Sequence, residues 1–360
     1  MPPDNKGLFV EGDRLMTICN ACRYCEGYCA VFPAMERRTA FEPADLRYLA
    51  NLCHNCAECY YACQYAPPHE FAINVPRNLA EIRVESYAHY AWPRAFGAAY
   101  RANGMLIFVL LTSAIAAALI GGMQIAPPAR AADFYGIIPH EKMVGLFGAI
   151  AAFVAIALAI GVRRFWRESS GGPVTLAMLR SAAGDVLKLR YLGSGGAGCT
   201  YPDEHHSLAR RRFHHLTFYG FALCFASTSV AAVYHSIFGW HAPYGYFSLP
   251  VVLGAAGGIG LLAGPAGLFW LKVRHDPRTG DPRQKGLDYA FISILFVTSL
   301  TGLLLLILRG SEWMPALLSV HLAAVAVMFL TLPYGKFVHG IYRSAALLRD
   351  AAERMQYKTN

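Results

Sequence analysis

The chain has 360 residues, enough for two or three domains, and carries a formal net charge of +9. Hydrophobic residues make up 55% of it, charged residues only 15%, and the mean hydropathy is +0.33. The apolar residues gather after residue 100, where stretches such as 143–162 lack the polar face of a soluble helix. This composition argues against a soluble helical protein, and the distribution of basic residues described below argues against a nucleic-acid binder.

The first 100 residues contain two cysteine runs with the same spacing. Residues 19–29 read CNACRYCEGYC and residues 53–63 read CHNCAECYYAC, both of the form C-x2-C-x2-C-x3-C. Zinc sites typically use separated C-x2-C pairs, whereas three cysteines at spacing three plus a fourth suit a cubane cluster. In two-cluster ferredoxins, the fourth cysteine of each run binds the other cluster. The repeated spacing therefore predicts two [4Fe–4S] clusters.

The expected ligands are Cys19, Cys22, Cys25 and Cys63 for cluster 1, and Cys53, Cys56, Cys59 and Cys29 for cluster 2. The runs depart from the ferredoxin pattern because Ala30 and Gln64 stand where proline usually follows the fourth cysteine. His54, inside the second run, is interpreted as a surface histidine. C-x-x-C-H occurs nowhere in the sequence, so covalent haem attachment is unsupported.

A linker helix and six membrane spans are expected after the cysteine runs. The helix is predicted at 75–91, and AWPR at 91–94 is interpreted as an interfacial anchor. About 20 apolar residues cross a bilayer. The predicted spans are 104–124, 143–162, 214–236, 247–271, 287–309 and 315–338. The spans contain almost no charged residues at depth, which argues against a transporter with a redox-sensing domain, the alternative from another functional class.

The basic residues predict the orientation of these spans. If residues 1–103 are inside and the spans alternate, the inside segments hold 29 of the 32 Lys and Arg residues. The outside loops then carry only Arg130, Lys142 and Arg309, in agreement with the positive-inside rule. The polar start lacks the apolar region of a signal peptide, so the cysteines are expected in the reducing cytoplasm. We therefore expect a multi-pass protein of a bacterial inner membrane, with its cysteine runs on the cytoplasmic side.

Four histidines of the membrane half are candidate ligands of b-type haem. We expect His214 and His339 to hold an inner haem, and His235 and His321 to hold an outer one. His321 and His339 are 18 residues apart, so a single sixth helix would present both from one face. Helical phase favours His214 over His215 as the ligand. A single haem is the alternative to two.

Two glycine-rich stretches have simpler interpretations than a cofactor site. GSGGAG at 193–198 matches G-x-G-x-x-G, but no strand, following helix or acidic residue completes a dinucleotide-binding unit. It is interpreted as a flexible loop that contacts the cluster domain or a partner. GAAGGIGLLAGPAG at 254–267 is interpreted as a surface for ordinary helix packing, with close approach to a porphyrin as the alternative.

These motifs together carry a family resemblance. The run CNACRYCEGYCAVFPAME, the second run CHNCAECYYAC, the segment RRRFHHLTFYGF and the six spans resemble the B protein of tricarballylate (citrate) utilisation over nearly the whole chain. The last span, around PYGKFVH, is also similar to nitrate-reductase gamma-type cytochrome b subunits. In the first family, a separate FAD-dependent dehydrogenase oxidises tricarballylate to cis-aconitate. The B protein reoxidises the flavin and passes the electrons to quinone.

The resemblance implies an electron-transfer subunit with three partners: a cytoplasmic FAD-containing dehydrogenase, a membrane quinone and the lipid bilayer. A related fused protein serves cobalamin synthesis, so a flavoprotein or oxygenase of that pathway is the alternative partner. The expected fold class is α, a bacterial-ferredoxin-like two-cluster domain followed by an all-α membrane domain. The domains are placed at 1–100 for the clusters, 101–345 for the membrane part with a cytoplasmic loop at 163–213, and 346–360 for a tail.

Overall fold

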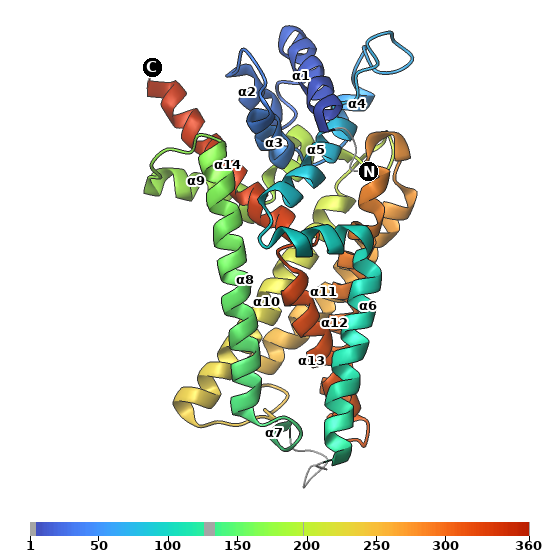
Figure 1. Cartoon of the computed structure of the whole chain (residues 1–360), viewed down its shortest axis with the longest axis vertical. Helices are drawn as coiled ribbons and strands as arrows, with labels where there is room; N and C mark the ends of the chain where they lie inside the picture. Colours follow the sequence, from blue (N-terminus) through green and yellow to red (C-terminus); the bar gives the residue numbers. More distant parts are fainter. Residues whose placement is uncertain (1–4, 126–133, 197, 360) are drawn as a thin grey trace.

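The helices of the N-terminal region form one end of the molecule, and the long helices run away from it (Figure 1). The computed structural model describes residues 5–125, 134–196 and 198–359. The N-terminal helices are α1 (Asn5–Cys22), α2 (Val31–Glu36), α3 (Pro43–Leu52), α4 (Glu58–Tyr61) and α5 (Val75–Tyr90). The described part of this region contains no strand. The predicted linker helix is therefore confirmed as α5.

Six helices are long and apolar enough to cross a membrane, as the hydropathy of the sequence predicts. They are α6 (Arg94–Ile125), α8 (His140–Glu168), α10 (Ala209–Phe238), α11 (Leu249–Arg274), α12 (Lys285–Ile307) and α13 (Met314–Thr331). The short helix α7 (Phe134–Ile137) lies at the end far from the N-terminal helices (Figure 1). Asn103 leaves helical geometry inside α6 and accepts a hydrogen bond from the Leu106 N–H, so the apolar span begins there.

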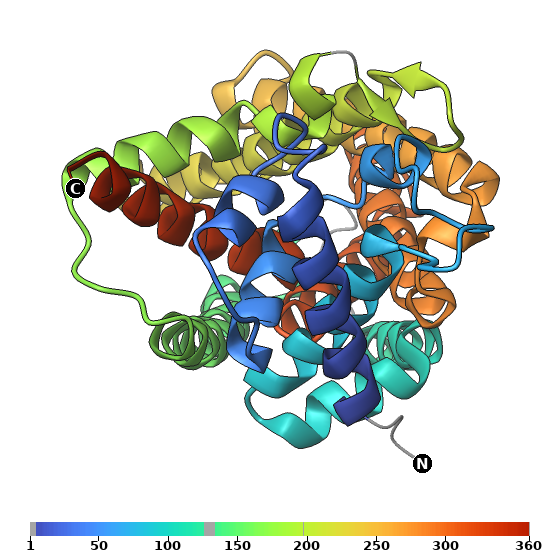
Figure 2. The same ribbon diagram turned by 90° about the horizontal axis from the view of Figure 1, so that it is seen from above.

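The remaining elements lie at the end of the bundle that carries the N-terminal helices (Figures 1 and 2). They are α9 (Leu176–Leu187), the 3₁₀ segments η1 (Arg190–Gly196), η2 (Pro277–Thr279) and η3 (Pro282–Gln284), the strands β1 (Cys199–Thr200) and β2 (His206–Ser207), and α14 (Val338–Thr359). The two strands pair antiparallel. The predicted loop at 163–213 therefore contains folded structure, and its hairpin packs against the second cysteine run.

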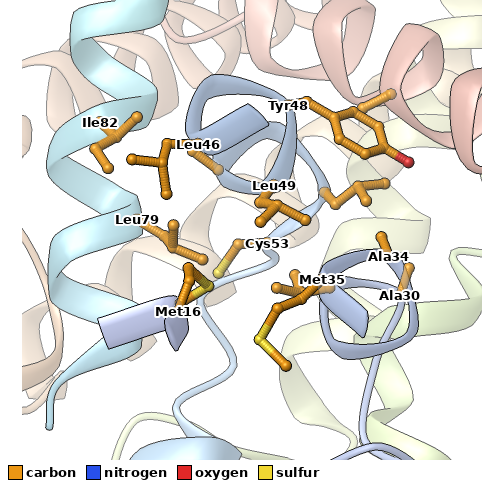
Figure 3. Packing of buried hydrophobic residues seen from close by; sticks show 14 of the residues in the cluster. Met16, Ala30, Ala34, Met35, Leu46, Tyr48, Leu49, Cys53, Leu79 and Ile82 are labelled. Atoms are coloured by element: carbon orange, nitrogen blue, oxygen red, sulfur yellow. The ribbon is translucent and has the colours of Figure 1, made fainter. Parts of the chain in front are cut away.

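The core of the N-terminal region is built from helix faces with a spacing of three residues. Leu46 and Leu49 of α3 meet Leu79 and Ile82 of α5, and all four are fully buried (Figure 3). Residues three apart lie on one face of a helix, so the two helices bury matching stripes. Cys53 joins the same core at the end of α3. The second cysteine run is thereby fixed to a rigid helix pair.

Helix α14 belongs to this core although it follows the last span. Ala346 and Leu347 are 0% and 2% exposed and pack with the residues of α3. The carboxylate of Glu353 accepts a hydrogen bond from the Arg38 guanidinium at 2.7 Å, and Asp350 accepts one from Arg37 at 3.0 Å. Residues 346–359, expected as a separate tail, continue a helix that begins at Val338 and stabilise the N-terminal region.

The membrane helices α10 and α11 pack with their backbones in close contact. A Cβ atom added at Gly257 would lie 2.7 Å from the carbonyl oxygen of Gly220, and one added at Gly264 would lie 2.7 Å from the Thr217 nitrogen. Only glycine permits this approach. The interpretation of 254–267 as a helix-packing surface is confirmed.

One buried ion group joins three segments at the end of the bundle that carries the N-terminal helices, which we call the inner end. Asp288 of α12 contacts Lys272 of α11 at 2.6 Å and Lys336 at 2.9 Å, the latter just before α14. Asp288 is only 8% exposed. A buried charge requires a partner of opposite sign, so this carboxylate fixes the positions of both lysines.

Candidate functional site

The cysteines expected at cluster 1 line one cavity. Its walls include the four predicted ligands Cys19, Cys22, Cys25 and Cys63, together with Cys59. Cys19 and Cys22 come from the end of α1, and Cys63 follows α4. The structure therefore brings the fourth cysteine of the second run beside the first three of the first run.

The cysteines expected at cluster 2 line a second cavity. Its walls include the predicted ligands Cys53, Cys56, Cys59 and Cys29. Cys59, Phe32 and Val75 line both cavities, so the two are neighbours separated by a single layer of side chains. This geometry matches the crossed assignment that the duplicated spacing predicts.

The chemistry of these thiols fits a metal cluster. Burial, with the other cysteines nearby, raises the pKa of Cys19 and of Cys25 to about 12. Burial also raises the pKa of Cys29 and of Cys59 well above the ordinary value. Such thiols become thiolates only when a metal core supplies positive charge. Among the described residues no three candidate ligands are close enough for one ion, and a cubane spreads its ligands over a larger volume.

The fourth cysteine of each run receives the same pair of backbone contacts. The backbone N–H groups of Val31 and Phe32 lie near Cys29, and those of Tyr65 and Ala66 lie near Cys63. In both cases these groups belong to the second and third residues after the cysteine. The turn without a following proline therefore places two backbone N–H groups near each of these cysteines.

His54 is buried, and its interpretation as a surface histidine is wrong. Its side chain is 4% exposed. Burial, together with Arg343, Arg210 and Arg83, holds the pKa of His54 well below its ordinary value, so the ring is neutral. Its position between two cysteines gave no signal of this, because the groups that bury it come from distant segments.

The hairpin of the 163–213 loop contacts the second run. Cys199 is fully buried and packs with Cys56. Thr200 donates a hydrogen bond to the Cys56 carbonyl at 3.2 Å, and His206 contacts the Glu58 carboxylate at 2.9 Å. The sequence gave no indication of a role for Cys199, because a lone cysteine has no spacing to recognise.

The two inner histidines approach each other from different helices. His214 lies in the first turns of α10 and His339 in the first turn of α14. The Nδ1 atom of each faces a carbonyl oxygen of its own chain segment, that of Arg210 or Lys336. Burial, with Arg343, Lys336 and His214 nearby, holds the pKa of His339 well below its ordinary value. Its ring is thus neutral, the form in which an imidazole can bind a metal.

His215 points elsewhere. Its side chain is more exposed than that of His214, and its Nε2 lies 3.3 Å from the Lys188 carbonyl oxygen. The placement of these two neighbours agrees with the preference for His214 that helical phase indicates.

His321 and His339 do not share a helix, and that expectation is wrong. Helix α13 ends at Thr331 and α14 begins at Val338. The Tyr334 and Gly335 N–H groups both donate to the Thr331 carbonyl, which closes a turn. Pro333 and Gly335 are the sequence signals for this break, because each disfavours a continuous helix.

The two outer histidines have different neighbours. The Nδ1 atom of His321 lies 3.1 Å from both the Thr301 hydroxyl and the Thr298 carbonyl oxygen, and its ring packs against Gly302. His235 instead stacks on His140 with ring centroids 3.6 Å apart.

His241 also contacts His235, with the two Nδ1 atoms 3.0 Å apart. The structure thus adds His140 and His241 to the candidate residues at the outer end. Both stand in or beside interhelical segments, where helical phase gives no information. The pairing of His235 with His321 stays a prediction.

Comparison with known proteins identifies the family. The family model described as "Citrate utilization protein B Fer4-like domain" matches residues 12–89. The model described as "Citrate utilization protein B" matches residues 99–360. The chain belongs to the citrate utilization protein B family. The Fer4-like match indicates iron–sulfur clusters, and the six spans make this family member a multi-pass membrane protein.

A full-length relative supports the same conclusion. Citrate utilization protein B of Escherichia coli is 52% identical over 355 residues, which are 97% of this chain and 93% of the relative. The expected fold class is confirmed, with a Fer4-like region followed by an all-helical membrane region. No solved structure matches the chain.

Proposed function

We propose that this family member is the membrane electron-transfer subunit of a flavoprotein dehydrogenase:quinone oxidoreductase. Two [4Fe–4S] clusters and b-type haem, when bound, supply one-electron carriers between the flavin and the quinone. The observation that carries the proposal is the arrangement of the cysteines. All eight line two neighbouring cavities, and the helices that carry His214 and His339 are hydrogen-bonded to the second cysteine run.

Two arginines connect the second cysteine run to the helices that carry the inner histidines. Arg343 of α14 donates a hydrogen bond to the Cys53 carbonyl at 2.6 Å, and His339 lies one turn earlier on the same helix. Arg210 of α10 donates to the His54 carbonyl at 2.7 Å, and His214 lies one turn later. The helices that carry the expected inner ligands are thereby fixed to the second cysteine run.

The proposed electron donor is a separate cytoplasmic FAD-dependent dehydrogenase, of the type that oxidises tricarballylate to cis-aconitate. The family resemblance and the citrate-utilisation name of the relative support this assignment. The proposed location is a bacterial inner membrane with the cysteine runs on the cytoplasmic side, which the distribution of Lys and Arg supports.

The haem assignment rests on the histidines. His214 and His339 are proposed for the inner haem, because both are partly buried and neither Nε2 atom has a hydrogen bond among the described residues. His235 and His321 remain the proposed outer pair. A cobalamin-synthesis flavoprotein is the second candidate partner, because the cysteine and histidine sites do not depend on the substrate of the partner.

The first experiment is metal and haem analysis of the whole chain, purified anaerobically in detergent. We expect eight non-haem irons per chain, as two cubane clusters require, with one or two b-type haems by pyridine haemochrome. Absence of non-haem iron would refute the proposal. Eight irons without haem would retain the clusters and remove the haem from the electron path.

The second experiment is the variant Cys22→Ser. Cys22 is the most exposed of the predicted cluster 1 ligands, so its replacement disturbs the fold least. We expect loss of one cluster, loss of flavin reoxidation and retention of haem. The matched control is Cys224→Ser, which changes a cysteine of α10 outside both cavities. Unchanged flavin turnover in Cys22→Ser would contradict the proposed path.

A further inference from the structure

Three arginines surround the second cysteine run, and each donates to its backbone. Arg343 donates to the Cys53 carbonyl at 2.6 Å, and Arg210 donates to the Asn55 and His54 carbonyls at 2.8 and 2.7 Å. Arg83 also donates to the Cys53 carbonyl. They come from α5, α10 and α14, so three distant segments of the chain converge on residues 53–55.

None of these three arginines forms an ion pair with a carboxylate among the described residues, in contrast to Arg37, Arg38 and Arg47. Arg83 is only 4% exposed, and its Nε atom has no hydrogen-bond partner in the described structure. Burial of unpaired positive charge is costly. Carbonyl dipoles offset part of this cost, and the remainder calls for an anion close by.

The neighbouring second cavity provides that anion. Four thiolates outweigh the charge of a [4Fe–4S] core, so the bound cluster is negative overall. Cys53 and His54, whose carbonyls hold the arginines, also line this cavity. Arg210 and Arg343 act electrostatically on Cys56 and Cys53 respectively.

The first cavity has a different charge environment. The groups that act most strongly on Cys19 are other cysteines, and those that act on Cys25 include Glu58. Arg23 stands between two cysteines of the first run, but it is exposed and donates to the Asn20 carbonyl at 3.0 Å. Solvent screens an exposed charge, so its influence on a cluster is small.

We infer that Arg83, Arg210 and Arg343 hold the reduction potential of cluster 2 above that of cluster 1. Positive charge stabilises the reduced, more negative state of a cluster, and potentials follow local charge and hydrogen bonds to sulfur. This inference deepens the proposed function and rests on it. It assigns an order: the partner's reduced flavin is the reductant at cluster 1, and cluster 2 is the exit toward the membrane and the quinone oxidant, one electron at a time.

Cys199 is also expected to raise the reduction potential of cluster 2, through a contact that does not involve the arginines. It is 0% exposed, and its thiol packs against Cys56. The Cys199 thiol also lies 3.0 Å from the Leu192 carbonyl oxygen. When Cys56 is a thiolate ligand, it is the stronger acceptor because it is charged. A hydrogen bond to a ligand sulfur raises the potential of the cluster.

The test is a potentiometric titration of the cluster-loaded whole chain, followed by electron paramagnetic resonance. We expect two midpoint potentials in the wild type. Arg343→Gln should lower the higher one, with a change of at least tenfold in the reduced-to-oxidised ratio, which is about 59 mV for one electron. Arg343→Lys retains the charge and should restore most of the potential. Arg23→Gln, the matched control at the exposed arginine, should leave both values in place.

Three results would overturn the inference. They are a shift of the lower potential in Arg343→Gln, an equal shift in Arg23→Gln, and loss of haem with both cluster potentials unchanged. The last result would assign the arginines to haem carboxylates. Absence of cluster signals in the wild type would instead refute the proposed function, so the two failures are distinguishable.

A second set of variants covers the case in which Arg343→Gln does not fold. Arg210→Gln should lower the same higher potential, because it removes another of the three charges. Cys199→Ala should lower it by less, and Cys199→Ser, which keeps a donor, should restore it. Unchanged potentials in Arg210→Gln and Cys199→Ala would contradict the inference.

Discussion

The inner and outer ends of the membrane domain hold their histidines in different ways. At the inner end, His214 and His339 are oriented by backbone carbonyls. They lie on helices that are hydrogen-bonded to the second cysteine run. At the outer end, His321 is held by Thr298 and Thr301, while His235 contacts other histidines. Two histidines can bind one cofactor only if the helices that carry them are held together. At the inner end, the N-terminal region holds these helices.

The largest effect is expected from Asp288→Asn, which tests whether the inner end depends on its ion group. The change leaves Lys272 and Lys336 without their carboxylate. Loss of one partner from a buried ion pair costs about 3–5 kcal/mol. We expect a lower thermal midpoint in detergent, measured by circular dichroism. The control is Lys285→Gln, which changes an exposed cation on the same helix. An equal drop in the thermal midpoint of this control would contradict the role given to Asp288.

His339→Ala tests the inner pair directly. We expect loss of the inner haem and a fall in quinone reduction of more than about 100-fold. Changes to residues that only orient a metal ligand typically cost about 10–100-fold, and His339 is a proposed ligand itself. Pyridine haemochrome and quinone-analogue reduction measure the two effects. Cluster signals should persist, which shows that the chain is folded. Full haem content in this variant would assign the ligand to another residue.

At the outer end, His321→Ala should remove one haem and retain the inner one. The companion variants are His235→Ala and His140→Ala, because the two rings stack on each other. If His235→Ala loses the same haem and His140→Ala does not, the predicted outer pair stands. The opposite result would make His140 the ligand. Full haem in all three variants would leave the outer end structural.

The smallest effect is expected from His215→Ala. Its ring faces the Lys188 carbonyl and not His339. We expect unchanged haem content and quinone reduction, and any loss of stability within about 0.5 kcal/mol, as is usual for surface substitutions. Loss of the inner haem in this variant would reverse the choice between His214 and His215.

The sequence predicted those parts of the structure that depend on local pattern. The ligands of a cubane lie within a short run, so spacing alone assigned Cys19, Cys22, Cys25 and their duplicates to two sites. Hydropathy likewise gave the six spans, because a bilayer imposes a length on each. The helix break before Val338 was missed, although Pro333 and Gly335 indicate it.

Other features could not be predicted because no local pattern encodes them. Arg83, Arg210 and Arg343 come from three helices and meet only in the folded chain. Cys199 is a single cysteine more than 130 residues from the second run. Each becomes recognisable only when the loop, the last helix and the cysteine run are seen together.

The position of α14 has a consequence for how the protein is made. Its residues 346–353 complete a core most of whose other members lie in the first 90 residues, so that core can close only after all six spans have been synthesised. Contacts so distant in sequence form late. The six membrane helices have then already been made, so we expect iron–sulfur assembly on this chain to take place at the membrane surface. A stop codon that removes only α14 would leave every span intact and yield a protein unable to retain its clusters.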